Sequence, residues 1–144
     1  MRFMMLMIPK GYEGAKPGAM PDAKAVKAMM AYNRALQQAG VLLALDGLHP
    51  PSMGARVTFH SGKPKVALGP FPGQKETLGG YWMIQVKSKE EALDWACRCP
   101  ASDAETIEIR QVQELEDFPD DVQKAAAGFP EMQSQPSRVM DEAI

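Results

Sequence analysis

The sequence is poor in the residues on which most metal and redox sites depend, with two cysteines and two histidines among 144 residues. It also lacks an excess of positive charge, because 16 Lys and Arg are set against 18 Asp and Glu for a net charge of −2. Binding to the phosphate backbone of nucleic acids is therefore not expected. The apolar run near the N-terminus lasts six residues before Pro9, too short for a membrane span or a signal sequence. These absences predict a cytoplasmic protein that binds neither nucleic acid nor membrane.

The two cysteines form a C-x-C pair, Cys97 and Cys99, which does not indicate a metal or redox site. Ser88 followed by Glu91 is typical of a capping box, and it predicts a helix over residues 88–99. Side chains two apart on a helix point about 200° away from each other, so these thiols cannot share a metal ion or form a disulfide. Phosphate-binding glycine motifs are also missing. We therefore predict no metal and no cofactor.

The hydrophobic pattern predicts one α+β domain built from two strand–helix–strand units joined by a β-hairpin. The expected elements are a strand at 2–8, a helix between Asp22 and Gly40, a strand at 41–45, a hairpin at 56–68, a strand at 81–86, the helix at 88–99 and a strand at 105–110. This order is typical of a ferredoxin-like split βαβ fold, an antiparallel sheet with both helices on one face.

The first strand is apolar on both of its faces. Its residues are Phe3, Met5 and Met7 on one side and Met4, Leu6 and Ile8 on the other. Because the helices cover only one face of the sheet, the other would leave a large apolar patch in a monomer. We therefore expect a homodimer packed through the sheet face. The alternative is that residues 111–144 fold back over that face.

The stretch "LGPFPGQKETLGGYWMIQV", residues 68–86, places turns and a charged loop directly before a strand. Gly79 and Gly80 are expected to let the backbone pass close to a neighbouring element. Lys75 and Glu76 would then stand at the rim of a pocket. The alternative is that the glycines serve packing alone and that the charged pair is solvated.

Five polar residues at the ends of predicted elements are candidates for contact with a ligand. They are His49, Arg56, Lys75, Glu76 and Tyr81. Each also has a plainer interpretation, since a histidine in a proline-rich turn is often solvated and Tyr81 can pack in the sheet. No nucleophile, base and orienting group stand in a recognisable pattern, so the catalytic residues, if the chain has any, are not predicted.

One resemblance is specific enough to name a family. "LGPFPGQKETLGGYWMIQVKSKEEALDWACRCP" and "AYNRALQQAGVLLALDGLHPPS" resemble the DGPF-type branch of the YCII-related proteins. That resemblance implies a domain over residues 1–116 with a partly helical or extended tail at 117–144, and a dimeric α/β-barrel type of fold. It also implies a pocket near the dimer interface. No activity is generally established for this family.

Two departures from the family pattern limit what can be transferred. Leu68 stands where the family's namesake aspartate would be, and Met29 stands where the wider group has a histidine proposed for acid–base work. Neither side chain can move a proton, so that dyad is unavailable here. The favoured function is therefore the binding of a small molecule, with a regulatory role. The alternatives are a small enzyme of the lactone isomerase or dehalogenase type, and a structural, protein-binding dimer.

Overall fold

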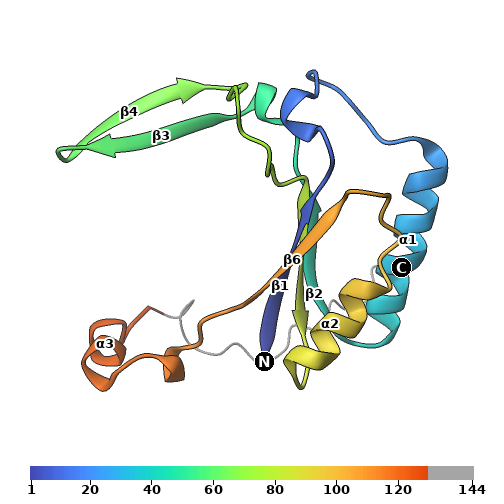
Figure 1. Ribbon diagram of the computed structural model, residues 1–144. Helices are drawn as coiled ribbons and strands as arrows, with labels where there is room; N and C mark the ends of the chain where they lie inside the picture. The colour runs from blue at the N-terminus through green and yellow to red at the C-terminus, as the bar shows by residue number, and fades with distance from the viewer. Residues whose placement is uncertain (130–144) are drawn as a thin grey trace.

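The computed structural model describes residues 1–129 and has the predicted α+β architecture (Figure 1). Its strands and longer helices are β1 (Arg2–Ile8), α1 (Ala23–Gln38), β2 (Leu42–Gly47), β3 (Ala55–His60), β4 (Lys63–Leu68), β5 (Gly80–Gln85), α2 (Lys89–Cys97), β6 (Thr106–Gln111) and α3 (Asp120–Ala125). Three short 3₁₀ helices are η1 (Tyr12–Gly14), η2 (Pro51–Met53) and η3 (Leu115–Asp117). No helix within residues 1–129 is long and apolar enough to cross a bilayer.

Four strands form the main sheet in the order β2-β5-β1-β6, and every neighbouring pair is antiparallel. This order is that of a ferredoxin-like fold, so the sequence prediction is confirmed. Helices α1 and α2 lie on the same side of the sheet, and within residues 1–129 the opposite face carries no helix of comparable length (Figure 1). The main sheet therefore has a helix-covered face and an outer face.

Alternate side chains of the central strands build the core between the sheet and the two helices. In β1 the core side chains are Phe3, Met5 and Met7, all buried, and Trp82 and Ile84 of β5 lie beside them. Tyr32 of α1 packs edge-on against Trp82, with ring centroids 5.7 Å apart, which is a favourable aromatic geometry. On the outer face Met4, Leu6 and Ile8 are only half-buried.

The helix boundaries follow the capping residues. Asp22 accepts a hydrogen bond from the backbone N–H of Ala25 at 2.7 Å, and Gly40, just past the end of α1, has a positive φ of 72°. Ser88 accepts a bond from the N–H of Glu91 at 3.2 Å, as the capping-box pattern predicts. Helix α2 ends at Cys97, two residues earlier than expected. Cys99 still packs against the core.

The β3–β4 hairpin forms a separate two-stranded ribbon, and all of its residues are exposed. Ser61 and Gly62 make its two-residue turn with positive φ angles of 49° and 75°, as the sequence predicts. The ribbon projects away from the sheet on the side opposite α1 and α2 (Figure 1). It therefore contributes little to the core of its own chain.

Gly79 and Gly80 stand where the backbone passes close to neighbouring elements, as expected. A Cβ on Gly79 would lie 2.4 Å from Cγ of Pro9, and one on Gly80 would lie 2.8 Å from the carbonyl oxygen of Asp46. Both distances are too short for a real side chain, so glycine is required for β5 to begin beside β1 and β2.

The chain leaves β6 along the N-terminal end of β1. Arg2 and Glu114 form a two-pronged ion pair with N–O distances of 2.7 and 2.9 Å. This pair raises the pKa of Arg2, with the hydrogen bond as the larger cause. Beyond it η3 and α3 lie on the outer-face side of the sheet (Figure 1). The rest of the predicted tail, residues 130–144, lies outside the described residues.

Candidate ligand-binding site

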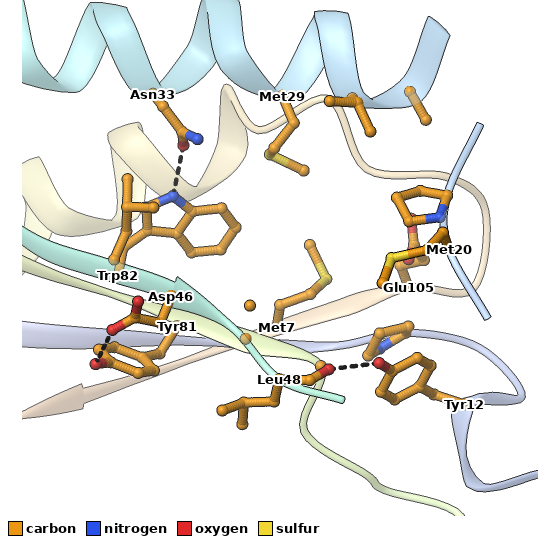
Figure 2. A pocket seen from close by; sticks show the side chains of 18 of the residues that line it. Met7, Tyr12, Met20, Met29, Asn33, Asp46, Leu48, Tyr81, Trp82 and Glu105 are labelled. Carbon is orange, nitrogen blue, oxygen red and sulfur yellow. Dashed lines mark hydrogen bonds between the residues drawn. The ribbon is translucent and has the colours of Figure 1, made fainter. Parts of the chain in front are cut away.

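A cavity of about 680 Å³ lies between the N-terminal half of α1 and the helix-covered face of the sheet. Figure 2 shows Met29 and Asn33 of α1 above it and Met7 and Trp82 of the sheet below it. The volume falls within the range of about 300–1,000 Å³ that is usual for small-molecule sites. It is therefore large enough for a ligand of drug-like size.

The cavity exists because α1 packs on the sheet with only half of its apolar stripe. The sequence predicts a single stripe containing Ala25, Met29, Tyr32, Leu36 and Ala39. Of these, Tyr32 and Leu36 are buried, whereas Ala25 is exposed and Met29 only half-buried. Ala25 and Met29 instead line the cavity. The first two turns of α1 thus present an apolar face that no side chain of the core fills.

Most of the cavity wall is apolar, and methionine side chains form much of it. Four methionines, Met7, Met20, Met29 and Met30, contribute to the lining, and Trp82 adds an aromatic ring. Methionine side chains are unbranched and polarisable, so they adapt to ligands of different shape. Met20 is 71% exposed, so much of this apolar surface is not covered by any other part of residues 1–129.

The loop between β1 and α1 closes one side of the cavity. The hydroxyl of Tyr12, in η1, donates a hydrogen bond to the carbonyl oxygen of Leu48, after β2 (Figure 2). Ser52, in η2, donates to the carbonyl oxygen of Ala15 at 2.9 Å. These two bonds fasten the glycine- and proline-rich loop to the segment after β2, so the loop forms a fixed wall.

Two of the polar side chains that line the cavity, Asn33 and Glu105, already accept hydrogen bonds from the chain itself. Trp82 donates its indole N–H to Oδ1 of Asn33 at 2.8 Å. Glu105 also contributes to the lining, and one of its carboxylate oxygens accepts from the N–H of Ser102 at 2.7 Å. Among residues 1–129, no Lys or Arg contributes to the lining. This part of the chain therefore offers no lysine or arginine cation to an anionic ligand.

Tyr81 and Asp46 form a polar pair at the edge of the cavity, on the other side of the strands. The Tyr81 hydroxyl donates to Oδ2 of Asp46 at 2.7 Å, and this bond is the main reason why the pKa of Tyr81 is raised. Figure 2 shows their side chains on the opposite side of the strands from Trp82. Both residues contribute to the lining, yet their side chains lie on the outer face.

The structure brings together two of the five residues predicted to contact a ligand. His49 and Tyr81 contribute to the cavity lining, whereas Arg56, Lys75 and Glu76 do not. Arg56 lies over the ring of Phe71, 4.5 Å from its centroid. Lys75 and Glu76 are exposed in the loop before β5. Contact of these three with a ligand stays a prediction.

Sequence reasoning missed most of the residues that line the cavity, including Met7, Met29, Asn33, Trp82 and Glu105. The hydrophobic pattern predicts that Met7, Met29 and Trp82 pack in the core, and for Met7 and Trp82 that is also correct. One feature of the sequence could have indicated the cavity. The loop at residues 9–20 is rich in glycine and proline, which allows it to hold the start of α1 away from the sheet.

Comparisons with known proteins agree with the fold. A family model described as the YCII-related domain matches residues 1–116. A protein of Rhizobium meliloti (strain 1021), described as uncharacterized, is 33% identical over 75 residues. The match covers 52% of this chain and 60% of that relative, so the chain spans less than two thirds of the relative's length.

Proposed function

We propose that this chain, which belongs to the YCII-related family, binds an uncharged or cationic apolar small molecule in the cavity between α1 and the sheet. The observation that carries the proposal is the lining itself, which is rich in methionine, contains the carboxylate of Glu105 and draws no Lys or Arg from the described part of the chain. A buried anion without a partner would lose its hydration and gain no ion pair in return. A ligand with an apolar body and one amine or hydroxyl group would lose less hydration and could form a hydrogen bond to the carboxylate of Glu105.

Binding rather than turnover is the function that these residues favour. Met29 lines the cavity at the position where the family resemblance places a histidine. A thioether packs against a ligand but cannot act as an acid or base at neutral pH. We therefore propose a binding role with a regulatory purpose in the cytoplasm, a location that rests on the sequence prediction alone.

Three probes with an indole body test the ligand class by titration calorimetry: tryptamine, tryptophol and indole-3-acetate. Tryptamine and tryptophol should each bind at least tenfold more tightly than indole-3-acetate, and chromatography should recover all three unchanged. Equal or tighter binding of indole-3-acetate would contradict the proposed ligand class. Conversion of a probe would favour the enzyme alternative.

A matched pair of variants tests the location. Ala25 and Ala31 are both exposed on α1, but only Ala25 contributes to the lining. Ala25→Phe should fill the cavity and weaken tryptamine binding at least tenfold. Ala31→Phe should leave it unchanged. If the two variants bind tryptamine equally well, the ligand does not occupy this cavity.

The proposal includes a homodimer through the outer face of the sheet. Met4, Leu6, Ile8 and Met83 lie only half-buried there, and such a face is stabilised by a second copy. Tyr81 and Asp46 have their side chains on the same face, so one edge of the cavity would border the dimer. Sedimentation equilibrium should report twice the chain mass of 15.8 kDa at micromolar concentration. A monomer across that range would rule out the dimer and leave the cavity proposal standing.

A further inference from the structure

The β3–β4 ribbon has one face that is entirely apolar. The strand register places Ala55, Val57 and Phe59 opposite Leu68, Val66 and Pro64, so these six side chains share a face. Phe59 is 73% exposed and Leu68 is 79% exposed. An isolated two-stranded ribbon is marginally stable in water, and apolar surface of this extent is typical of an interface.

The other face and the tip of the ribbon carry positive charge. Residues 55–68 contain three cationic side chains, Arg56, Lys63 and Lys65, and no Asp or Glu. Lys63 and Lys65 are exposed, and they stand at the end of the ribbon that lies farthest from the sheet. The ribbon thus combines an apolar face with a cationic tip.

The segment of opposite charge follows β6. Residues 112–129 contain five carboxylates, Glu114, Glu116, Asp117, Asp120 and Asp121, and one cation, Lys124. Asp120 and Asp121 are exposed at the start of α3. The same segment exposes apolar side chains, because Val122 is 40% and Phe129 57% exposed. We call residues 112–129 the acidic arm.

The ribbon and the acidic arm extend from opposite ends of the sheet, and both lie on its outer-face side (Figure 1). In the proposed dimer, two symmetric arrangements of the outer faces are available. One sets each ribbon against the partner's acidic arm, and the other sets ribbon against ribbon and arm against arm. The second places like charges together, at a cost that the first avoids.

We propose that each cationic ribbon docks on the acidic arm of a second copy of this chain, so that the dimer is held by two reciprocal clasps. The inference rests on the proposed dimer and adds its orientation and its charged contacts. The apolar face of the ribbon is then buried against the partner, together with Val122 and Phe129 of the arm. The partner is a second copy because the chain itself supplies both complementary surfaces.

Charge reversal tests the clasp by sedimentation equilibrium on the full chain. Lys63→Glu with Lys65→Glu should raise the dimer dissociation constant at least tenfold, and so should Asp120→Lys with Asp121→Lys. The variant with all four changes should return to within about threefold of the wild type, because both clasps regain opposite charges. Lys24→Glu with Lys27→Glu is the control, since it changes the net charge equally on exposed positions of α1.

The wild-type chain supplies a second measurement that needs no variant. Raising the salt from about 0.1 M to about 1 M shortens the Debye length from about 10 Å to about 3 Å and should weaken a clasped dimer several-fold. Three results would overturn the clasp while leaving the sheet-face dimer intact. The dissociation constant could be unchanged in both double variants, it could stay raised in the variant with all four substitutions, or it could fall as the salt concentration rises. A wild-type monomer would overturn both, whereas tryptamine binding would be unaffected.

Discussion

The indole N–H of Trp82 donates to Oδ1 of Asn33 at 2.8 Å, and this bond joins β5 to α1 at the edge of the cavity. On one side of it Tyr32 and Leu36 hold α1 against the sheet. On the other side, Met29 and Ala25 line open space. The bond therefore marks the boundary between the packed half of α1 and the half that is available to a ligand.

Removing the acceptor of this bond should destabilise the fold. Asn33→Leu would leave the buried indole N–H without a partner, at a cost of about 1–3 kcal/mol in the free energy of unfolding. Asn33→Asp keeps an acceptor at the same place and should cost less. Urea denaturation of the two variants and the wild type measures the difference. Equal stability of both variants would show that the bond does not hold α1 in place.

Gly79 offers a test of close backbone packing. Its Cβ would meet the Pro9 ring at 2.4 Å, so Gly79→Ala should force β1 and β5 apart and cost about 1–3 kcal/mol. Gly14→Ala is the matched control, since a Cβ there meets nothing within 4 Å. Thermal unfolding should separate the two variants clearly. Similar midpoints for both would mean that the chain relaxes around the new methyl group.

Most of the fold could be predicted from the sequence because local signals agree with one another. Asp22 and Ser88 cap the helices, Ser61-Gly62 turns the hairpin, and Ile107 and Ile109 alternate with polar neighbours. Each of these signals is set within a few residues. The order of the strands then follows from the limited ways of packing two strand–helix–strand units.

The site was harder to predict because it depends on where packing fails. Met29 has the same apolar character as a core residue, and only the position of the whole helix shows that it lines a cavity. Periodicity reports which face of a helix is apolar, but it does not report how far that face lies from the sheet. His49 was found because it follows a strand, whereas Lys75 was chosen for its loop, and its own side chain does not line the cavity.

The loop before β5 yields a prediction about the two charged candidates. Lys75 and Glu76 are exposed and do not line the cavity, so Lys75→Ala with Glu76→Ala should change the free energy of unfolding by no more than about 0.5 kcal/mol. The cavity lining predicts an unchanged tryptamine affinity, whereas the sequence prediction that this pair contacts a ligand predicts a weaker one. Calorimetry on the double variant checks this, and a weaker affinity would return the loop to the binding site.

The last prediction concerns the two cysteines, which differ in their surroundings. Burial raises the pKa of Cys99 from 9.0 to about 11, and the nearby carboxylate of Glu105 adds to the shift. At about pH 8 only about one Cys99 thiol in a thousand would be ionised. Cys97 is exposed, whereas Cys99 is half-buried. Iodoacetamide at this pH should therefore label Cys97 and spare Cys99, as peptide mass spectrometry would show.

The same shift gives a stability effect with a definite sign. Because the folded-state pKa of Cys99 is raised, the native chain keeps the proton longer, and this contribution is present below about pH 9 and is lost as the pH rises through about 11. We expect about 1 kcal/mol after allowing for partial exposure. Cys99→Ala should remove that part of the pH dependence. Subtracting the variant's free energy of unfolding from that of the wild type at each pH cancels the groups whose pKa does not depend on Cys99, whereas Tyr32 is coupled to it. A difference that stays flat across the window, or rapid labelling of Cys99 at pH 8, would show that the thiol is solvated in the folded chain.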